Sequence, residues 1–313
     1  MPCGQCGLTG NFPVRIHKGK AMLRKAESAG DADDPNAASM ARAAERLVRK
    51  AAGGALDWEG ASLASHFQPI LAVRGPSCQG YEALLRAADA AGRRVAAGEL
   101  FARTPESARA VLDWTCRALH LRNYARFDAD ERMLFLNVHP QAAAHDASCA
   151  RELAELVRYY GLHPKRVCVE IIAEDCDERG LADAVSVYRS LGLAIAIDDF
   201  GKARSNFDRV LALRPDMVKL DRALVADALL GWGRARRMLG GMVELLHEVR
   251  ARVVIAGIES AAEARVAIEA GADFVQGFYF CAPDAGPADE GAALSRLDAV
   301  LRSGGHGKLA LVS

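Results

Sequence analysis

Nine polar side chains stand within, or at the carboxyl ends of, otherwise apolar segments of this 313-residue sequence. A buried ionised group is costly unless it is paired or bound to a metal. One such residue is usually structural, but several segments that each contribute one or two indicate a common site. The nine are Glu82, Asn137, Glu170, Asp198, Asp199, Lys219, Asp221, Glu259 and Gln276.

Carboxylates and an asparagine carbonyl are hard oxygen ligands, which suit Mg²⁺, Mn²⁺ or Ca²⁺. Adjacent acids such as Asp198 and Asp199 can help to hold two metal ions that activate a water molecule beside a phosphate. Lys219 would orient that water or neutralise developing charge. The residues therefore predict a metal-dependent phosphoester site, with a structural charge network as the alternative.

Short apolar runs alternate with helical stretches from about residue 64 onward. Eight strand-like runs and their helices over about 240 residues fit an α/β fold of the (β/α)₈ barrel type, where the carboxyl ends of the strands meet at one face. An open doubly wound sheet is the alternative, but it usually carries a glycine-rich loop after its first strand, and none is present. The runs are 66–73, 80–87, 132–140, 166–172, 193–200, 216–225, 252–260 and 273–280, and the expected helices are 40–53, 106–120, 149–160, 181–190, 234–250 and 261–270. Thr104 and Pro105 resemble an N-cap followed by proline at the first helical position.

Composition excludes several classes of protein. Apolar residues make up 51% and charged residues 26% of the chain, which is typical of a folded protein. Forty basic and 40 acidic residues give zero net charge, which argues against a polycation that coats DNA. No apolar run is long enough to cross a bilayer or to serve as a secretory signal, so we expect a cytoplasmic location.

The first 60 residues predict an N-terminal extension with three parts. Residues 1–26 are a basic arm without acids, 27–39 a linker, and 40–53 a helix that lies on a surface or pairs with a partner. Cys3 and Cys6 form half of a zinc or redox site, although an ordinary flexible terminus is the alternative. A barrel over 61–305 and a tail over 306–313 complete the predicted organisation.

Seven segments in order resemble the EAL domain family. "GYEALLR" contains its name motif at Glu82, Ala83 and Leu84, after "FQPILAV". "LNVHP", "VEIIAED", "AIDDFG", "RPDMVKLDRALV", "IAGIES" and "FVQGFYFCAP" resemble its later strands, so the resemblance covers about 66–285. It implies a modified TIM barrel with an antiparallel first strand, which hydrolyses or binds the bacterial second messenger cyclic di-GMP. Active members use Mg²⁺ or Mn²⁺ and yield the linear dinucleotide pGpG.

The resemblance also implies roles for individual residues. Metal ligands would be Glu82, Asn137, Glu170 and Asp198, with Asp199 at a second metal. In an active member, catalysis would rest on Lys219, Glu82 and Asp199. The nucleotide pocket would include Gln68, Glu82, Leu84, Arg86, Asn137, Asp221, Gln276 and Pro283.

Three departures from the family pattern indicate a degenerate member. Ala256 replaces a glutamate that acts as a second-metal ligand or general base, and Glu259 lies an odd number of strand residues away, on the opposite face. Lys202 and Arg204 follow the acidic pair, where they either weaken the second metal or are solvated loop charges. Ile172 and Ala173 replace a threonine–glutamate pair that anchors a loop in active members.

Three functions fit these observations. The first is a signalling protein that binds cyclic di-GMP or a protein partner, with weak or absent hydrolysis and a weak or absent second metal. The second is an active phosphodiesterase, and the third is a regulator that binds no nucleotide. The N-terminal extension is the predicted partner-binding arm, and the family resemblance suggests a homodimer.

Overall fold

The computed structural model describes residues 37–304, apart from 52, 128–131, 139–147, 173–177, 203–206, 232 and 287–288. The predictions for Cys3, Cys6, the basic arm, most of the linker, Ala173 and Arg204 lie outside the described residues. Predicted domain boundaries at 60 and 305 therefore stay predictions.

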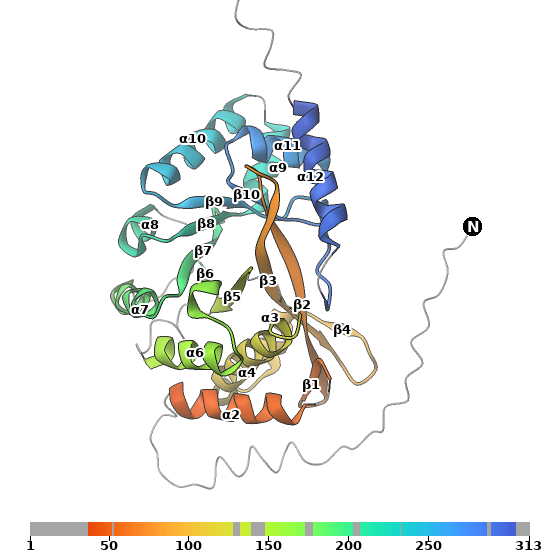
Figure 1. Cartoon of the computed structure of the whole chain (residues 1–313), viewed down its shortest axis with the longest axis vertical. Helices are drawn as coiled ribbons and strands as arrows, with labels where there is room; N and C mark the ends of the chain where they lie inside the picture. The colour runs from red at the N-terminus through yellow and green to blue at the C-terminus, as the bar shows by residue number, and fades with distance from the viewer. Residues whose placement is uncertain are drawn as a thin grey trace, which may run out of the picture.

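Eight strands close into a barrel, and they coincide with the eight strand-like runs of the sequence (Figure 1). They are β2 (Ala61–Ala72), β3 (Ser77–Ala88), β5 (Met133–Val138), β6 (Val167–Ile172), β7 (Ala194–Phe200), β8 (Met217–Leu220), β9 (Arg252–Ile255) and β10 (Phe274–Val275). Strand β2 pairs antiparallel with both β10 and β3, whereas the pairs from β3 through β5 to β10 are parallel. The modified barrel with an antiparallel first strand is confirmed. Two short strands, β1 (Ala55–Trp58) and β4 (Arg94–Val95), extend the sheet at β2 and β3.

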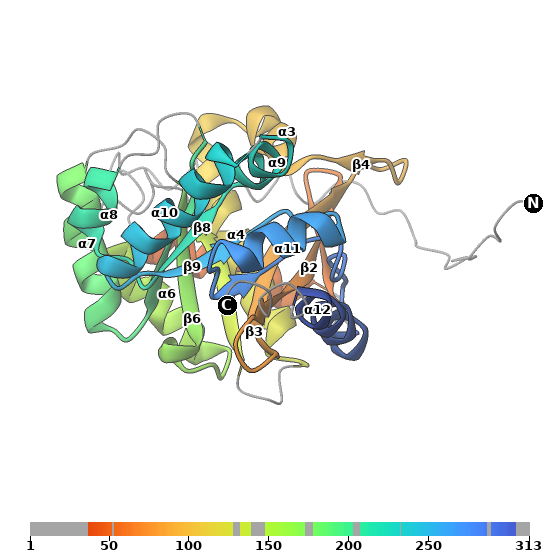
Figure 2. The same ribbon diagram turned by 90° about the horizontal axis from the view of Figure 1, so that it is seen from above.

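Helices surround the strands, and Figure 2 shows α6, α7, α8 and α10 outside β6, β8 and β9. All the predicted helices are present, with ends that shift by a few residues. The helices are α2 (Ala37–Lys50), α3 (Ala97–Arg103), α4 (Glu106–Tyr124), α6 (Ser148–Tyr159), α7 (Glu178–Ser190), α8 (Phe207–Leu213), α9 (Arg222–Leu230), α10 (Arg234–Glu248), α11 (Ala261–Glu269) and α12 (Glu290–Gly304), with a 3₁₀ turn η1 (Pro164–Arg166).

The predicted cap at Thr104 and Pro105 was wrong. Pro105 itself is the N-cap of α4, and no side chain caps that helix end. The Thr104 hydroxyl instead donates to the Leu100 carbonyl, so Thr104 ends the preceding helix α3. A short helix before the proline was not expected, and it takes the threonine as its own C-cap.

Helix α2 packs against α4 and α6 of the barrel's outer layer (Figure 1). Its buried face consists of Ala37, Ala41, Ala44 and Val48, and small side chains of this kind let two helices approach closely. Arg122 of α4 donates hydrogen bonds to the carbonyls of Val48 and Gly53 at the end of α2. The sequence predicts that this helix lies on a surface or pairs with a partner, and in the structure it packs on the outer helices of the barrel.

A buried polar cluster joins α4 to β2. His120 Nδ1 lies 2.8 Å from Ser65 Oγ, and Asn123 donates to the same hydroxyl at 3.1 Å. Burial, assisted by the nearby Arg86 guanidinium, lowers the pKa of His120 to about 4. The folded protein therefore holds this imidazole neutral where an unfolded chain would protonate it.

We expect His120 to make the protein less stable in mild acid. Because its folded pKa lies below the unfolded value, its contribution is complete above about pH 6.5 and is lost as the pH falls toward 4, a change of about 3 kcal/mol. Urea unfolding at several pH values would measure this loss. His120→Gln should flatten the curve between pH 6.5 and 4, and an unchanged curve would contradict the assignment.

Candidate functional site

The candidate site is the upper of two layers of side chains that fill the barrel. The lower layer is an apolar cluster of Ile70, Phe135, Cys168, Ala196, Met217, Val254 and Phe274. Side chains two residues apart on a strand share a face, so the next inward residue toward the mouth follows by a step of two. That step leads to Gln68, Asn137, Glu170, Asp198, Lys219, Ala256 and Gln276, and Glu82 stands two residues after Gly80. Seven of these eight inward positions are polar, and Ala256 is the exception.

Gly80 has a steric reason to be glycine, because a methyl group there would overlap the Met133 carbonyl of the neighbouring strand. This close approach of β3 to β5 brings Glu82 beside Asn137. The Asn137 amide donates to Glu82 Oε1 at 3.3 Å. Two residues from separate sequence segments thus reach the same side of the mouth.

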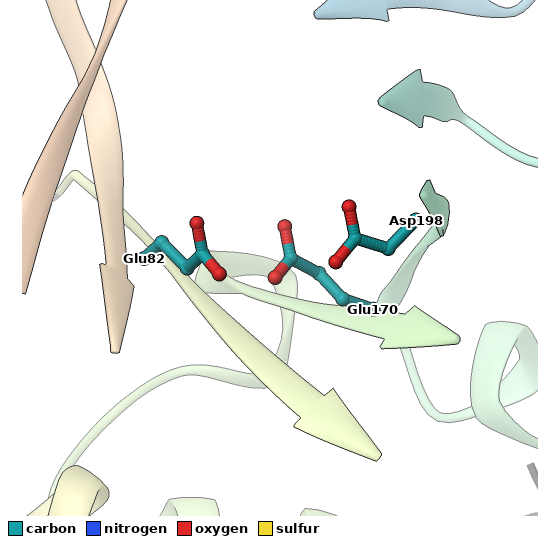
Figure 3. A group of neighbouring side chains, drawn as sticks. All are labelled: Glu82, Glu170 and Asp198. Carbon is teal, nitrogen blue, oxygen red and sulfur yellow. The ribbon is translucent and has the colours of Figure 1, made fainter. Parts of the chain in front are cut away.

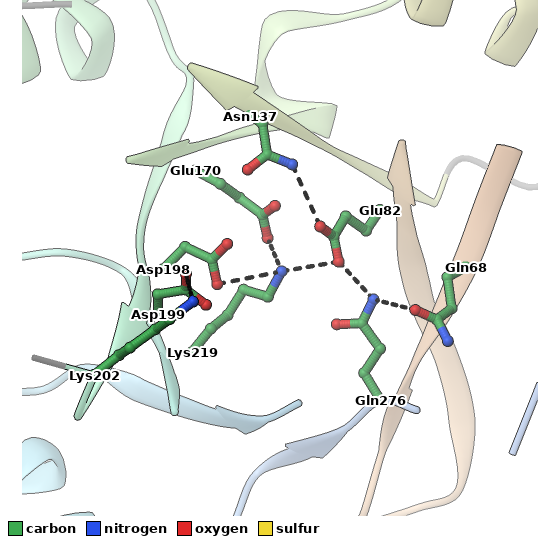
Figure 4. A network of polar contacts seen from close by, with 9 residues as sticks. All are labelled: Gln68, Glu82, Asn137, Glu170, Asp198, Asp199, Lys202, Lys219 and Gln276. Carbon is green, nitrogen blue, oxygen red and sulfur yellow. Dashed lines mark hydrogen bonds and ion pairs between the residues drawn. The ribbon is translucent and has the colours of Figure 1, made fainter. Parts of the chain in front are cut away.

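The Lys219 ammonium lies among three carboxylates (Figure 4). Its Nζ is 2.7 Å from Glu170 Oε1, 2.9 Å from Glu82 Oε2 and 3.6 Å from Asp198 Oδ1. The ammonium side chain is only 2% exposed, and Glu170 is fully buried. The family resemblance predicts Lys219 beside the attacking water, and the structure places it in direct ion pairs with three of the predicted metal ligands.

The protonation of the three carboxylates differs with their partners. Burial tends to raise the pKa of Glu82, but the Lys219 ammonium and the amides of Gln276 and Asn137 outweigh it and hold the pKa below its ordinary value. Burial raises the pKa of Glu170 well above its ordinary value, and it also raises that of Asp198, although Lys219 opposes both shifts. The single positive charge of Lys219 therefore does not neutralise all three buried carboxylates.

The same three acids form a group that fits a divalent cation (Figure 3). One oxygen from each of Glu82, Glu170 and Asp198 lies within 4.8 Å of the others. Glu170 Oε2 is buried and accepts no hydrogen bond from any described residue. An orphaned carboxylate oxygen within a hard-ligand set suits Mg²⁺, Mn²⁺ or Ca²⁺.

Asp199 stands apart from this group. It has a left-handed backbone, with φ of 55°, at an irregularity in the β7–β8 pairing. Its Oδ2 lies 3.3 Å from Lys202 Nζ. Lys202 therefore approaches Asp199, the predicted second-metal ligand. This is expected if Lys202 weakens the second metal, which is one of the two interpretations of this loop.

The mouth encloses a cavity of about 210 Å³ that most of the predicted nucleotide residues line. Leu84 and Asp221 line it together with six of the eight inward residues, whereas Asn137 and Glu170 do not line it. Gln276 connects the inward layer by donating to Glu82 at 2.6 Å and to Gln68 at 3.2 Å. Asp221 also caps α9 by accepting from the Ala223 amide.

Three predicted nucleotide residues do not line this cavity, and one of them, Asn137, instead donates to Glu82 beside it. Arg86 is half-buried on β3 and donates to the Leu85 carbonyl. The Pro283 carbonyl lies 3.1 Å from His66 Nδ1. All three stay predictions as pocket residues, because the cavity as described does not reach them.

Glu259 lies away from the metal ligands, but the reason differs from the one that the sequence suggested. Strand β9 ends at Ile255, so strand alternation does not apply between Ala256 and Glu259. Glu259 is exposed and pairs with Arg222 through both guanidinium nitrogens, one of them at 3.0 Å. This ion pair keeps Glu259 outside the mouth.

Arg222 and Gly257 both line the cavity, although neither was predicted as a site residue from the sequence. Gly257 has φ of 72°, and a Cβ there would come within 2.7 Å of Arg222 Cβ. The signal that could have found the pair is the position of Arg222 directly after the Lys219–Asp221 segment, at the start of a helix. The approach of Arg222 to Gly257 could not be predicted, because it forms only when the barrel closes.

A family model described as "EAL domain" matches residues 54–283. The chain belongs to the EAL domain family. Curated relatives include "Cyclic di-GMP phosphodiesterase RocR" of Pseudomonas aeruginosa, 29% identical over 157 residues, which are 48% of this chain and 38% of that protein. The EAL-domain protein YkuI of Bacillus subtilis is 26% identical over 225 residues, or 70% of this chain and 54% of YkuI.

Solved structures share the fold. YkuI in complex with cyclic di-GMP and calcium is 24% identical with a TM-score of 0.68, and the match covers 78% of this chain and 61% of that one. A standalone EAL protein of Vibrio cholerae O395, bound to cyclic di-GMP, is 25% identical with a TM-score of 0.66, covering 74% of this chain and 97% of that one. This chain spans only about a third of the length of some curated relatives, such as 31% of a protein of Azorhizobium caulinodans and 28% of YkoW of Bacillus subtilis.

None of the helices in the described part is long and apolar enough to cross a membrane.

We predict that the Lys219 ammonium stabilises the metal-free EAL barrel. Lys219→Met leaves three buried acids without their cation and should lower the free energy of unfolding by about 3–5 kcal/mol in EDTA. Mn²⁺ should restore more stability to this variant than it adds to the wild type. Thermal unfolding with and without Mn²⁺ measures both effects.

Lys202→Met is the matched control for this experiment, since its ion pair with Asp199 is largely exposed and should contribute at most about 1 kcal/mol. Equal losses in the two variants would contradict a special role for Lys219. So would a Lys219→Met variant that gains no more from Mn²⁺ than the wild type does.

Proposed function

We propose that this EAL domain binds cyclic di-GMP at the barrel mouth and hydrolyses it very weakly or not at all. The observation that carries the proposal is Ala256, a methyl group at the one inward position of the mouth where the polar layer is interrupted. The family pattern has a glutamate there. A methyl group neither ligates a cation nor accepts a proton.

Binding is supported by what the mouth retains. Gln68, Gln276 and Arg222 line the cavity, and their nitrogens donate to the Cys281 carbonyl, to Glu82 and to Glu259 respectively. On exchanging these partners, amide and guanidinium groups would donate hydrogen bonds to phosphate oxygens and nucleobase edges. The Gln276 Oε1 atom is buried and accepts no hydrogen bond from the described residues, which leaves it for a ligand donor. Structures of two relatives are described as cyclic di-GMP complexes.

One divalent cation, Mg²⁺ or Mn²⁺, fits the retained acids. Glu82, Glu170 and Asp198 would hold it, with Asn137 beside them. When bound, such an ion would activate a water molecule and polarise a phosphate oxygen. Lys219 holds the acids together and contributes positive charge near the phosphate.

A second cation fits poorly, and this supports weak hydrolysis. Asp199 is paired with Lys202, and Ala256 supplies no ligand. Losing one group of a two-metal site removes several kcal/mol of transition-state stabilisation, a loss on the order of 10²-fold in rate. The alternative of an active phosphodiesterase is favoured by the intact set of three acids and Lys219.

We expect little pGpG from this chain. Purified protein incubated with cyclic di-GMP and Mn²⁺ should convert it at a rate on the order of 10²-fold below an active EAL enzyme assayed alongside it. The product is measured by chromatography. Turnover comparable to the active enzyme would overturn the proposal in favour of a phosphodiesterase.

Restoring the acid locates the defect. Ala256→Glu should raise the rate on the order of 10-fold or more, because a carboxylate would again reach the mouth beside Asp198 and Lys219. Ala256→Gln is the matched control, since it adds the same volume without charge and should gain nothing. If neither variant gains activity, the altered loop after Asp199 limits the reaction instead.

Calorimetry distinguishes a receptor from a regulator that binds no nucleotide. Cyclic di-GMP should bind the wild type, and Gln276→Ala should weaken the affinity by about 10-fold because it removes a buried polar partner. No heat of binding with Mg²⁺, Ca²⁺ or EDTA would favour the regulator. The protein partner, the homodimer and the cytoplasmic location stay predictions of the sequence.

A further inference from the structure

Basic side chains gather at the end of the barrel opposite the mouth. The loops that lead into the parallel strands meet at this end, as does the turn between β2 and β3. We call its six exposed cations the basic floor. They are Arg74, Arg158, Lys165, Arg214, Arg250 and Arg252.

The basic floor has no acidic partners in the part of the chain that the structure describes. Elsewhere many arginines are paired, for example Arg93 with Asp89 and Arg103 with Glu99. The acids nearest the floor have other partners: Asp216 accepts from the Ile195 amide, and Asp273 accepts from the Val253 amide and contacts His247. Glu248, at the end of α10, is an exposed acid at this end, against the six exposed cations of the described floor.

Two of the six cations occupy backbone positions that favour glycine. Five helix-to-strand loops at this end each contain one left-handed residue. Three of them use Gly161, Gly192 and Gly271, whereas Arg214 and Arg250 adopt φ of 47° and 64° at the corresponding positions. A side chain in this conformation costs free energy that glycine avoids. Loop geometry alone would favour glycine at both positions, so we infer that the two arginine side chains have another role.

We propose that the basic floor docks this domain on an anionic lipid bilayer. The six cations stand at four connections of the barrel end: Arg74 in the β2–β3 turn, Arg158 and Lys165 between the end of α6 and β6, Arg214 between α8 and β8, and Arg250 and Arg252 at the start of β9. Because these connections lie around the barrel end, an extended anionic surface can contact several of them at once, whereas a nucleic-acid duplex would meet only a stripe of them. Docking by this end leaves the mouth open to its ligand. Asp128, Asp130 and Glu131 lie outside the described part, so the floor is defined from β6 round to β2.

The test is sedimentation of the full chain with vesicles at low and physiological salt. Vesicles of phosphatidylglycerol and phosphatidylcholine should bind the protein, and pure phosphatidylcholine should not. Each basic residue near such a surface contributes roughly a fivefold factor, so Arg214→Gly together with Arg250→Gly should lower vesicle affinity by about 30-fold. Glycine suits both backbone positions, so this double variant should fold at least as well as the wild type.

Arg93→Gln with Arg103→Gln is the matched control, because it removes two charges from the β3–β4 turn and α3, away from the floor. It should leave vesicle binding nearly unchanged. The proposal is overturned if anionic vesicles do not bind, if both double variants lose affinity equally, or if a 30-base-pair duplex binds more tightly than the vesicles. A lower melting temperature with unchanged vesicle binding in Arg214→Gly and Arg250→Gly would also overturn it, since the arginines would then only cap helices.

Discussion

The ion pair between Lys219 and Glu170, with Nζ and Oε1 2.7 Å apart in a fully buried setting, is the interaction on which the barrel mouth depends. Burial of either charge alone would be prohibitive, and the pair still leaves Glu82 and Asp198 to be compensated. The surrounding amides of Asn137 and Gln276 satisfy Glu82. Glu170 keeps one oxygen, Oε2, that accepts no hydrogen bond from the described residues.

This arrangement separates two properties that a phosphodiesterase combines. The retained acids and Lys219 are one coupled unit, which preserves the shape of the mouth and a place for one cation. The capacity for a second cation depends on groups outside that unit, at Asp199 and at position 256. Because the two sets of groups are distinct, the proposed loss of hydrolysis does not require loss of the proposed nucleotide pocket.

Charge is also divided between the two ends of the barrel. The zero net charge of the whole chain is an average, which conceals acids gathered at the mouth and cations gathered at the floor. Zero net charge argues against a polycation that coats its partner on all sides. It does not argue against a single face with a strong local field, and the described part of the chain presents one.

Much of the fold and part of the site could be predicted from the sequence, because strand alternation and helix periodicity are local. The eight strands and the inward direction of Glu82, Glu170 and Lys219 follow from residues a few positions apart. The antiparallel first strand and the loss of a polar group at Ala256 were implied by the family resemblance. Tertiary structure alone decided which of these groups touch: Lys219 within reach of three acids, Glu259 drawn outward by Arg222, and α2 held against α4 by Arg122. These contacts join residues that are tens of positions apart, and closure of the barrel, rather than any local pattern, sets their distances.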